Sequence, residues 1–407
     1  MPSQPAPDFV LANALMPDGR RGAIGIAQGR IVEIAATPRP GVPGIDLAGD
    51  LVMPGFVDGH MHLDKTLVGL GWMPHQAKPD RMSRIETDKR IWPTLNLSVA
   101  ARAANLIELC IAHGTTQIRT HVDVDTEGKL SQLHGVLEAR ERYRDRVSIE
   151  IVAFPQSGVM RRPGTLDLLD AAVADGADLV GGIDPLEIDR DPAGQLSGIF
   201  AIAERRGIGL DIHLHEPGEL GLFNVHEICR RTEASGLGGK VTISHGFCLG
   251  MVADAKADDA ASRMARAGVS LVTHGGASAA IPPLLKLRAA GVEVFAGNDD
   301  VRDTWSPYGS GDMLERAMLI GWRSDFRRDD QLALAFDLVS AAGARALGLG
   351  PHGIAVGAPA DLSVAAASGV PEAVVAHPPR KWVMKRGRIV ARGGSTLARP
   401  EAPVGLA

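Results

Sequence analysis

Residues 53–66 read MPGFVDGHMHLDKT, an apolar run that ends in two histidines one residue apart, His60 and His62. Successive side chains of a β-strand point to opposite faces, so His60 and His62 would share one face. Two neutral imidazoles aimed at one point suit a metal ion. The stretch therefore predicts a buried strand that ends at a functional site.

Similar apolar runs recur up to about residue 350. They are TTQIRTHVDVD, VSIEIVAFPQ, DLVGGIDP, IGLDIHLHE, VTISHGF, VSLVTHGG and VEVFAGND. Ala- and Leu-rich stretches of helical pattern separate them, and several of these stretches end in Gly, a helix-stop signal. Near-continuous apolar strands imply burial on both faces, so eight strand–helix pairs predict a (β/α)8 TIM barrel. The alternative is an open doubly wound sheet, but neither GxGxxG nor GxxxxGK(S/T) supports a nucleotide-binding version.

The two ends of the chain differ from its middle. Residues 8–50 and about 356–396 contain short β runs separated by turn residues such as Asp18-Gly19. We expect residues 1–50 and 351–407 to form one small β-sandwich domain beside a barrel of residues 51–350. Residues 69–93 are rich in polar residues, Pro and Trp and are too long for a simple connection, which is typical of a lid or of a variable surface insertion.

Composition narrows the function classes. The 407 residues are 45% apolar and 22% charged, which is ordinary for a soluble globular protein, and the net charge of −5 gives no reason to expect a nucleic-acid or membrane partner. We find no signal peptide and no run of about 18 apolar residues. Cys110, Cys229 and Cys248 form no CxxC pair. We therefore expect a cytoplasmic protein, which could be a homo-oligomer.

Barrel enzymes carry their chemistry at the carboxyl ends of their strands. In the predicted strands these ends carry His60, His62, His121, Asp123, Gln156, Asp184, His213, His215, Glu216, His245, His274, Asp299 and Asp300. His60, His62, His213 and Asp299 together offer three nitrogens and one carboxylate oxygen, which suits Zn or Fe(II) and leaves room for water. A lone histidine at a strand end is usually a hydrogen-bonded core residue. That structural role explains a set of four converging residues less well than metal binding does.

These segments also carry a resemblance to a known family. PGFVDGHMHLDKT, RTHVDVD, VAFPQSG, HLHEPG, SHGF and NDDVRDTWSPYGSGDM follow one another as in the cytosine deaminase-like branch of the amidohydrolase superfamily, over nearly the whole chain. DLVGGIDP, THVDVD and Lys65 look closer to N-isopropylammelide amidohydrolase, a relative that acts on s-triazine rings. Glu216 looks like the cytosine deaminases, because the triazine enzyme has Asp there.

The resemblance implies a role for each matching residue. The metal ligands would be His60, His62, His213 and Asp299. The catalytic groups would be Glu216 as the proton-shuttling acid, His245 as the residue that orients the attacking water, and Asp299. The substrate-binding residues would be Gln156, Asp300 and Trp305. His215 stands where the bacterial cytosine deaminase has Asp, and the fourth strand lacks the lysine that bridges two metals in many relatives, so we expect one divalent ion.

We therefore predict an enzyme that deaminates a small N-heterocycle, cytosine or a close analogue, and releases ammonia. Glu216 can protonate a ring nitrogen and the leaving amine if a closed pocket raises its pKa. Gln156 can read an adjacent N–H and C=O, because its planar amide has one acceptor and one donor group. Trp305 and Phe154 could form flat walls around such a ring.

Other hypotheses stay open. An N-substituted amine on an s-triazine, or a cyclic amide, could be hydrolysed instead. A non-catalytic scaffold fits less well with the full ligand set and Glu216. No P-C-x-x-C motif is present, which argues against a cytidine deaminase fold, and the acidic balance disfavours a nucleic-acid substrate. Lys65 and Arg302 could be charges at the barrel mouth or solvated surface groups.

Overall fold

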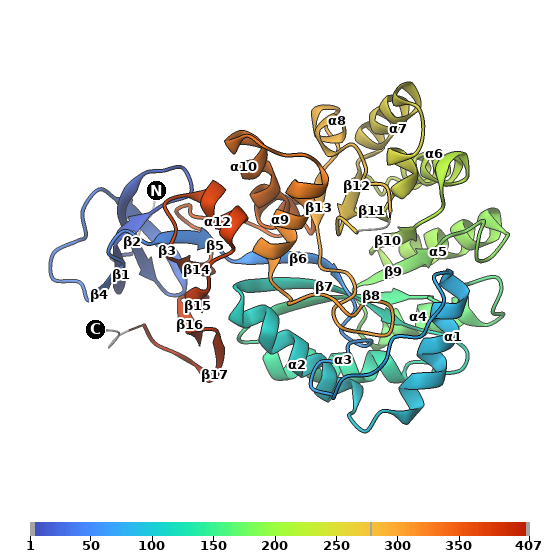
Figure 1. Cartoon of the computed structure of the whole chain (residues 1–407), viewed down its shortest axis with the longest axis horizontal. Helices are drawn as coiled ribbons and strands as arrows, with labels where there is room; N and C mark the ends of the chain where they lie inside the picture. Colours follow the sequence, from blue (N-terminus) through green and yellow to red (C-terminus); the bar gives the residue numbers. More distant parts are fainter. Residues whose placement is uncertain (1–4, 277–278, 404–407) are drawn as a thin grey trace.

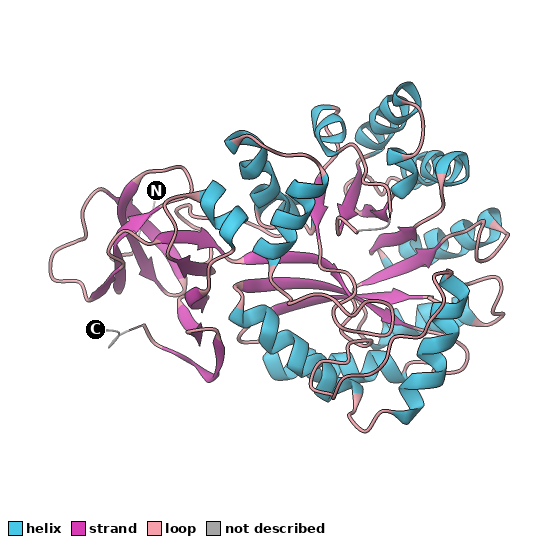
Figure 2. Ribbon diagram, in the orientation of Figure 1, coloured by secondary structure: helices cyan, strands magenta, loops and turns pink. Residues whose placement is uncertain are grey.

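The computed structural model describes residues 5–276 and 279–403. Its larger part is a barrel of eight parallel strands, each paired with the next in chain order, with helices around it (Figure 2). The barrel closes where the Asp299 amide donates to the His60 carbonyl at 2.7 Å and Met61 bridges Asp299. The predicted (β/α)8 barrel is confirmed. Its strands are β6 (Phe56–Met61), β7 (Thr115–Asp123), β8 (Ser148–Phe154), β9 (Leu179–Ile183), β10 (Gly209–Leu214), β11 (Val241–His245), β12 (Val269–Thr273) and β13 (Val294–Ala296).

The helices of the barrel include those predicted from the Ala- and Leu-rich stretches, together with one in the polar segment of residues 69–93 and others after the last barrel strand. They are α1 (Arg81–Ile91), η1 (Trp92–Thr94), α2 (Val99–Ala112), α3 (Ser131–Tyr143), α4 (Thr165–Asp175), α5 (Pro192–Arg206), α6 (Gly218–Ser235), η2 (Phe247–Gly250), α7 (Asp254–Ala267), α8 (Leu284–Ala289), α9 (Met313–Arg323), α10 (Asp329–Leu338) and α11 (Ala341–Ala346). The glycine stop signals are real, since α5 ends at Gly207 with φ 70° and α6 at Gly236 with φ 67°.

Strands from both chain ends form a second, mixed sheet. They are β1 (Phe9–Leu15), β2 (Arg21–Ala27), β3 (Arg30–Ala35), β4 (Gly44–Asp46), β5 (Leu51–Pro54), β14 (Leu362–Ala365), β15 (Arg380–Lys385), β16 (Arg388–Arg392) and β17 (Ser395–Glu401), and α12 (Val370–Ala376) follows β14. In Figure 1 the blue and red strands lie side by side. β5 pairs antiparallel with β14 and meets β1 at Leu51, so it joins the two ends. As predicted, one small β-domain is built from both termini.

The apolar run that ends in His60, predicted as one strand, belongs to two strands in the structure. β5 ends at Pro54, which cannot donate a ladder hydrogen bond, and β6 begins after Gly55. A Cβ at Gly55 would lie 2.4 Å from the Thr116 side chain, so only glycine fits this crossing. The chain therefore passes from the terminal sheet into the barrel within one residue.

Buried polar contacts fix the sheet to the barrel at this crossing. The Gly55 amide donates to the Asp361 carbonyl at 2.8 Å. Lys385 is buried, and its Nζ donates to Asp361 Oδ2 at 2.7 Å and to the Thr116 carbonyl at 2.9 Å. A buried ammonium that lost this carboxylate would leave a charge without a partner, which is costly. The terminal sheet is therefore an integral support of the first barrel strand.

The largest apolar cluster fills the barrel wall and continues into the terminal sheet through residues such as Met53 and Val383. Strand residues such as Leu210 and Ile243 pack with inner helix residues such as Val225 in the barrel wall. Leu11, Ile24, Val364 and other residues of β1, β2 and β14 form a second cluster inside the terminal sheet.

Within the described ranges, no single helix is long and apolar enough to cross a membrane. The α1–η1 segment and α2 together reach that length and composition, with a bend of 109° between them.

Candidate metal and substrate site

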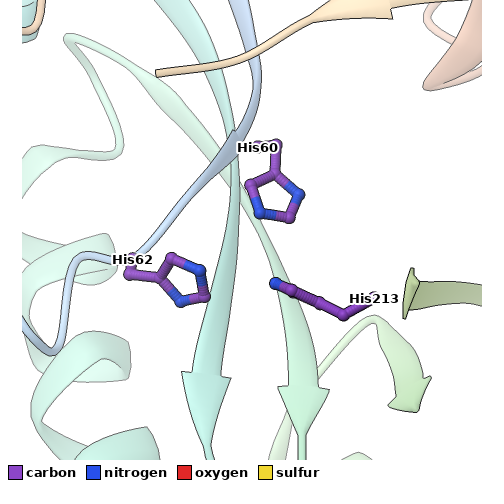
Figure 3. A group of neighbouring side chains, drawn as sticks. All are labelled: His60, His62 and His213. Atoms are coloured by element: carbon purple, nitrogen blue, oxygen red, sulfur yellow. The ribbon is translucent and has the colours of Figure 1, made fainter. Parts of the chain in front are cut away.

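The four predicted metal ligands lie together at the carboxyl end of the barrel. His60 and His62 come from the end of β6 and His213 from β10, and their side chains face a common point (Figure 3). These three residues offer nitrogen atoms within 4.8 Å of one another. The Nε2 atoms of His60 and His62 each lie 3.3 Å from Asp299 Oδ1. The four side chains meet at one point, as predicted from the alternation of side chains along a β-strand and from the position of these residues at strand ends.

The chemistry of this donor set fits one divalent metal ion. His60 Nε2 and both ring nitrogens of His213 are buried and have no hydrogen-bond partner among the described residues. Burial, with Lys65 nearby, lowers the pKa of His62 to about 3, and burial holds the pKa of His213 well below its usual range. Asp299 is also buried, but His274 and His245 hold its pKa well below the usual value. Neutral imidazoles beside a carboxylate are the protonation states that a metal requires.

A chain of hydrogen bonds fixes the tautomer of His60. Ser244 Oγ donates to Asp211 Oδ1 at 2.6 Å, so its lone pair faces His60 Nδ1 at 2.9 Å. His60 must then carry its proton on Nδ1, which leaves Nε2 free to bind a metal. Arg119 anchors Asp211 from below, with Nη1 3.1 Å from Asp211 Oδ2.

We expect Ser244→Ala to weaken metal binding about 10- to 100-fold, which is the usual cost of losing an outer-shell partner. Competition with a chelator of known affinity measures this change. Ser270→Ala is the matched control, because Ser270 lies on the neighbouring strand and bonds Thr242 and the Val241 carbonyl instead of a histidine. Equal metal affinity in the two variants would contradict the role of Ser244.

The backbone at three strand ends is strained. Asp184, His245 and Asp299 have φ values of 35°, 74° and 59°, in the left-handed region that favours glycine. Each such residue costs about 1–3 kcal/mol and persists where the surroundings dictate it. At Gly297 the chain passes so close to the His60 backbone that a Cβ would lie 2.4 Å from it, so a side chain does not fit there. The site is therefore assembled at the expense of local backbone strain.

His245 and His274 extend the cluster beyond the four ligands. His245 Nδ1 lies 3.1 Å from His274 Nδ1, and His274 Nδ1 lies 3.3 Å from Asp299 Oδ2. No partner for His274 could be predicted from the sequence. Its contact with Asp299 joins residues that follow two different strands, β12 and β13. His121 is buried in the same cluster, 3.7 Å from Asp211 Oδ2, and neither of its ring nitrogens has a hydrogen-bond partner among the described residues.

Glu216 is buried but is held by a different set of groups. Its Oε1 accepts from the Leu186 and Glu187 amides, each at 2.7 Å, and its Oε2 accepts from Asn224. Burial raises the pKa of Glu216, the direction that an acid catalyst requires. No hydrogen bond or ion pair in the described part of the chain joins Glu216 to the histidines. The nearby His215 instead bonds Asp184 at 2.8 Å.

A second group of side chains forms a wall beside the histidines. Phe154 stacks on His213 with ring centroids 4.0 Å apart. Lys65 is buried, with Nζ 4.6 Å from the Trp305 ring centroid and 5.5 Å from that of Phe154. Lys65 is thus a charge within the site, whereas Arg302 is exposed at the surface.

Two buried polar atoms in this wall have no hydrogen-bond partner among the described residues. Gln156 Oε1 and Asp300 Oδ1 are buried and accept no hydrogen bond within the described residues. Burial, Asp303 and Asp299 raise the pKa of Asp300 well above its usual value. Although burial alone would lower the pKa of Lys65, Asp300 and neighbouring acids raise it, so Lys65 stays charged. An oxo-substituted ring with an N–H would meet complementary groups here.

The segment of residues 69–93 supplies a residue that the sequence did not indicate. Eleven of its residues form α1, and Asp88 of α1 is fully buried against Gln156 and Trp305. At the start of α1, Arg81 pairs with Asp184 at 3.2 Å and with Glu187 at 2.7 Å. The segment therefore covers the barrel mouth, and it is more than a surface insertion.

Comparison with known proteins agrees with this geometry. The family model described as "Amidohydrolase family" matches residues 44–391. The N-isopropylammelide isopropyl amidohydrolase of Pseudomonas sp. (strain ADP) is 33% identical, over 91% of this chain and 93% of its own length.

Two solved structures resemble the whole fold. The N-isopropylammelide isopropylaminohydrolase of Burkholderia multivorans is 46% identical with a TM-score of 0.91, over 96% of this chain and 99% of its own. The 5-methylcytosine deaminase of Klebsiella pneumoniae, liganded with phosphonocytosine, is 25% identical with a TM-score of 0.83, over 96% and 100% of the two chains. Together with the histidine cluster, these matches make this chain a member of the amidohydrolase family, a metal-dependent hydrolase that acts on C–N bonds.

Proposed function

We propose that this enzyme removes an N-alkylamino group from an s-triazine-type ring by hydrolysis. The observation that carries the proposal is the 46% identity to an N-isopropylammelide isopropylaminohydrolase over almost the full length of both chains. The sequence pointed first to deamination of a cytosine-like ring, and this similarity supports the alternative better. Lys65, which looked closer to the triazine enzymes, is a buried charge of the site.

The site residues suggest how the ring is held. Phe154 and Trp305 provide flat walls, and Lys65 offers its ammonium to a ring oxygen. Gln156 Oε1 and Asp300 Oδ1 are acceptors for ring N–H groups. A planar ring with alternating N–H and C=O groups satisfies all of these atoms, whereas an apolar ring would leave them unpaired at a cost of about 1–3 kcal/mol each.

The chemistry would be shared between a metal and the chain. One divalent ion, Zn or Fe(II), supplies Lewis acidity that makes water nucleophilic near neutral pH. His60, His62, His213 and Asp299 would hold it. Asp299 and His245 would orient the water and accept its proton, and Glu216 would deliver a proton to the ring nitrogen and to the leaving amine.

Deamination of a cytosine-like ring is the second candidate. Glu216 favours it, because it matches the cytosine deaminases where the triazine enzyme has Asp. His215, which bonds Asp184, argues against an identical substrate, because the cytosine deaminase has Asp at that position.

We expect N-isopropylammelide to have a higher kcat/KM than ammelide, cytosine or isocytosine. A head-to-head comparison on protein of defined metal content tests this, with isopropylamine and ammonia measured separately. Release of the alkylamine supports the proposal. Turnover of cytosine or isocytosine alone, with ammonia as the only product, would overturn it in favour of the second candidate.

A further inference from the structure

Asp88 of α1 sits at the centre of the substrate wall. Its Oδ2 accepts from Gln156 Nε2 at 2.9 Å and from Trp305 Nε1 at 2.7 Å, and its Oδ1 accepts from Thr304 Oγ1. It is fully buried, which raises its pKa to about 6, and the nearby Lys65 favours the ionised form, so Asp88 is a carboxylate at neutral pH. Three donors from two separate loops thus converge on one carboxylate.

This contact decides which way the Gln156 amide faces. An ionised carboxylate only accepts hydrogen bonds, so the group of Gln156 that faces Asp88 must be the NH2. The Trp305 indole is a donor only, which requires the same oxygen of Asp88 to be an acceptor. The carbonyl oxygen of Gln156 then points away from Asp88, and it is this Oε1 that is buried without a partner.

We propose that Asp88 is a specificity-determining positioning residue, which turns the carbonyl of Gln156 toward the substrate and so selects rings that present an N–H at that edge. The sequence suggested that Gln156 reads an N–H and a C=O together. With one amide N–H committed to Asp88, Gln156 serves mainly as the acceptor, and Lys65 is left to recognise the ring oxygen. The inference rests on the proposed function only for the identity of the ring.

The test compares the best substrate with its isosteric analogue in which the edge N–H is a C–H. The wild-type enzyme should prefer the N–H ring by about 5- to 150-fold in kcat/KM, because the analogue leaves Gln156 Oε1 unpaired. In Asp88→Ala the Gln156 amide is free to turn, so the preference should fall toward one. The loss should appear mainly in KM, with metal content unchanged, because edge recognition contributes equally to ground and transition states.

Two further variants separate hydrogen bonding from charge. In Asp88→Asn, the amide oxygen can take the place of Asp88 Oδ2 and accept from Gln156 and Trp305, while the NH2 takes the place of Oδ1 and donates to Thr304 Oγ1, so this variant should restore most of the preference. Glu86→Ala removes an exposed carboxylate from the same helix and should match the wild type. A preference retained in Asp88→Ala, or lost equally in Asp88→Asn and Asp88→Ala, would overturn the proposal.

One readout needs no substrate. The Trp305 indole N–H, identified in an NMR spectrum by its absence in Trp305→Phe, should exchange slowly in the wild type and faster in Asp88→Ala. Unchanged exchange would contradict the contact itself. Slow exchange in a protein that turns over only cytosine would instead overturn the proposed triazine substrate and leave the role of Asp88 intact.

Discussion

His62→Ala should abolish both metal binding and turnover. The wild-type protein is expected to hold about one equivalent of a divalent ion, and removing one of four ligands from a buried site should reduce this to a small fraction. Activity should fall on the order of 10³-fold or more, because a metal supplies several kcal/mol of transition-state stabilisation and each 1.36 kcal/mol is tenfold in rate. Elemental analysis and kcat/KM measure the two effects.

His134→Ala is the matched control for the metal experiment. His134 lies on α3, its side chain is 59% exposed, and it pairs with Asp175 at the surface. Its loss should leave metal content and turnover unchanged. Two equivalents of metal in the wild type, or full metal content in His62→Ala, would contradict a single ion held by these four ligands.

Glu216→Gln should lower kcat by about 10²- to 10⁴-fold, the usual contribution of general acid–base catalysis. The structure makes this substitution a clean one. The new amide oxygen can accept from the Leu186 and Glu187 amides as the carboxylate does. The new NH2 can donate to Asn224 Oδ1, which is buried and without a partner in the described structure, if Asn224 rotates. The substitution then removes the titrating group and its charge while these contacts persist.

Glu219→Gln controls for the loss of a nearby negative charge. Glu219 is exposed in the first turn of α6 and pairs with Lys256 at 2.6 Å. It should turn over at the wild-type rate. Near-normal kcat in Glu216→Gln, with full metal content, would show that another group carries the proton.

The parts of this molecule that follow a local pattern could be predicted from the sequence. The spacing of His60 and His62, at the end of an apolar run, fixes their common face without any tertiary information. Placement of His213 and Asp299 followed from one rule, that parallel barrel strands end at the same rim. The strand break at Pro54-Gly55 was missed because the apolar run continues across it.

Contacts between distant loops could not be predicted in this way. Asp88 lies in RMSRIETDKRI, whose many polar residues give no sign of a buried side. Its burial depends on Trp305 and Gln156, which come from other loops. Glu216 Oε1 accepts from backbone amides of the loop after β9, and a backbone amide leaves no pattern of residue types in the sequence from which the contact could be predicted. His274 gained a role only when β12 and β13 became neighbours.

The pairing of β5 with β14 has a consequence for synthesis on the ribosome. β5 runs through Gly55 into the strand that carries His60, yet its partner Leu362–Ala365 is made only after the whole barrel sequence. At about 5–20 residues per second, that interval is on the order of tens of seconds. All four residues of β5 are buried in the finished molecule, so during translation they form an apolar edge that has no partner. We expect this edge to be the segment of the nascent chain that most needs a chaperone.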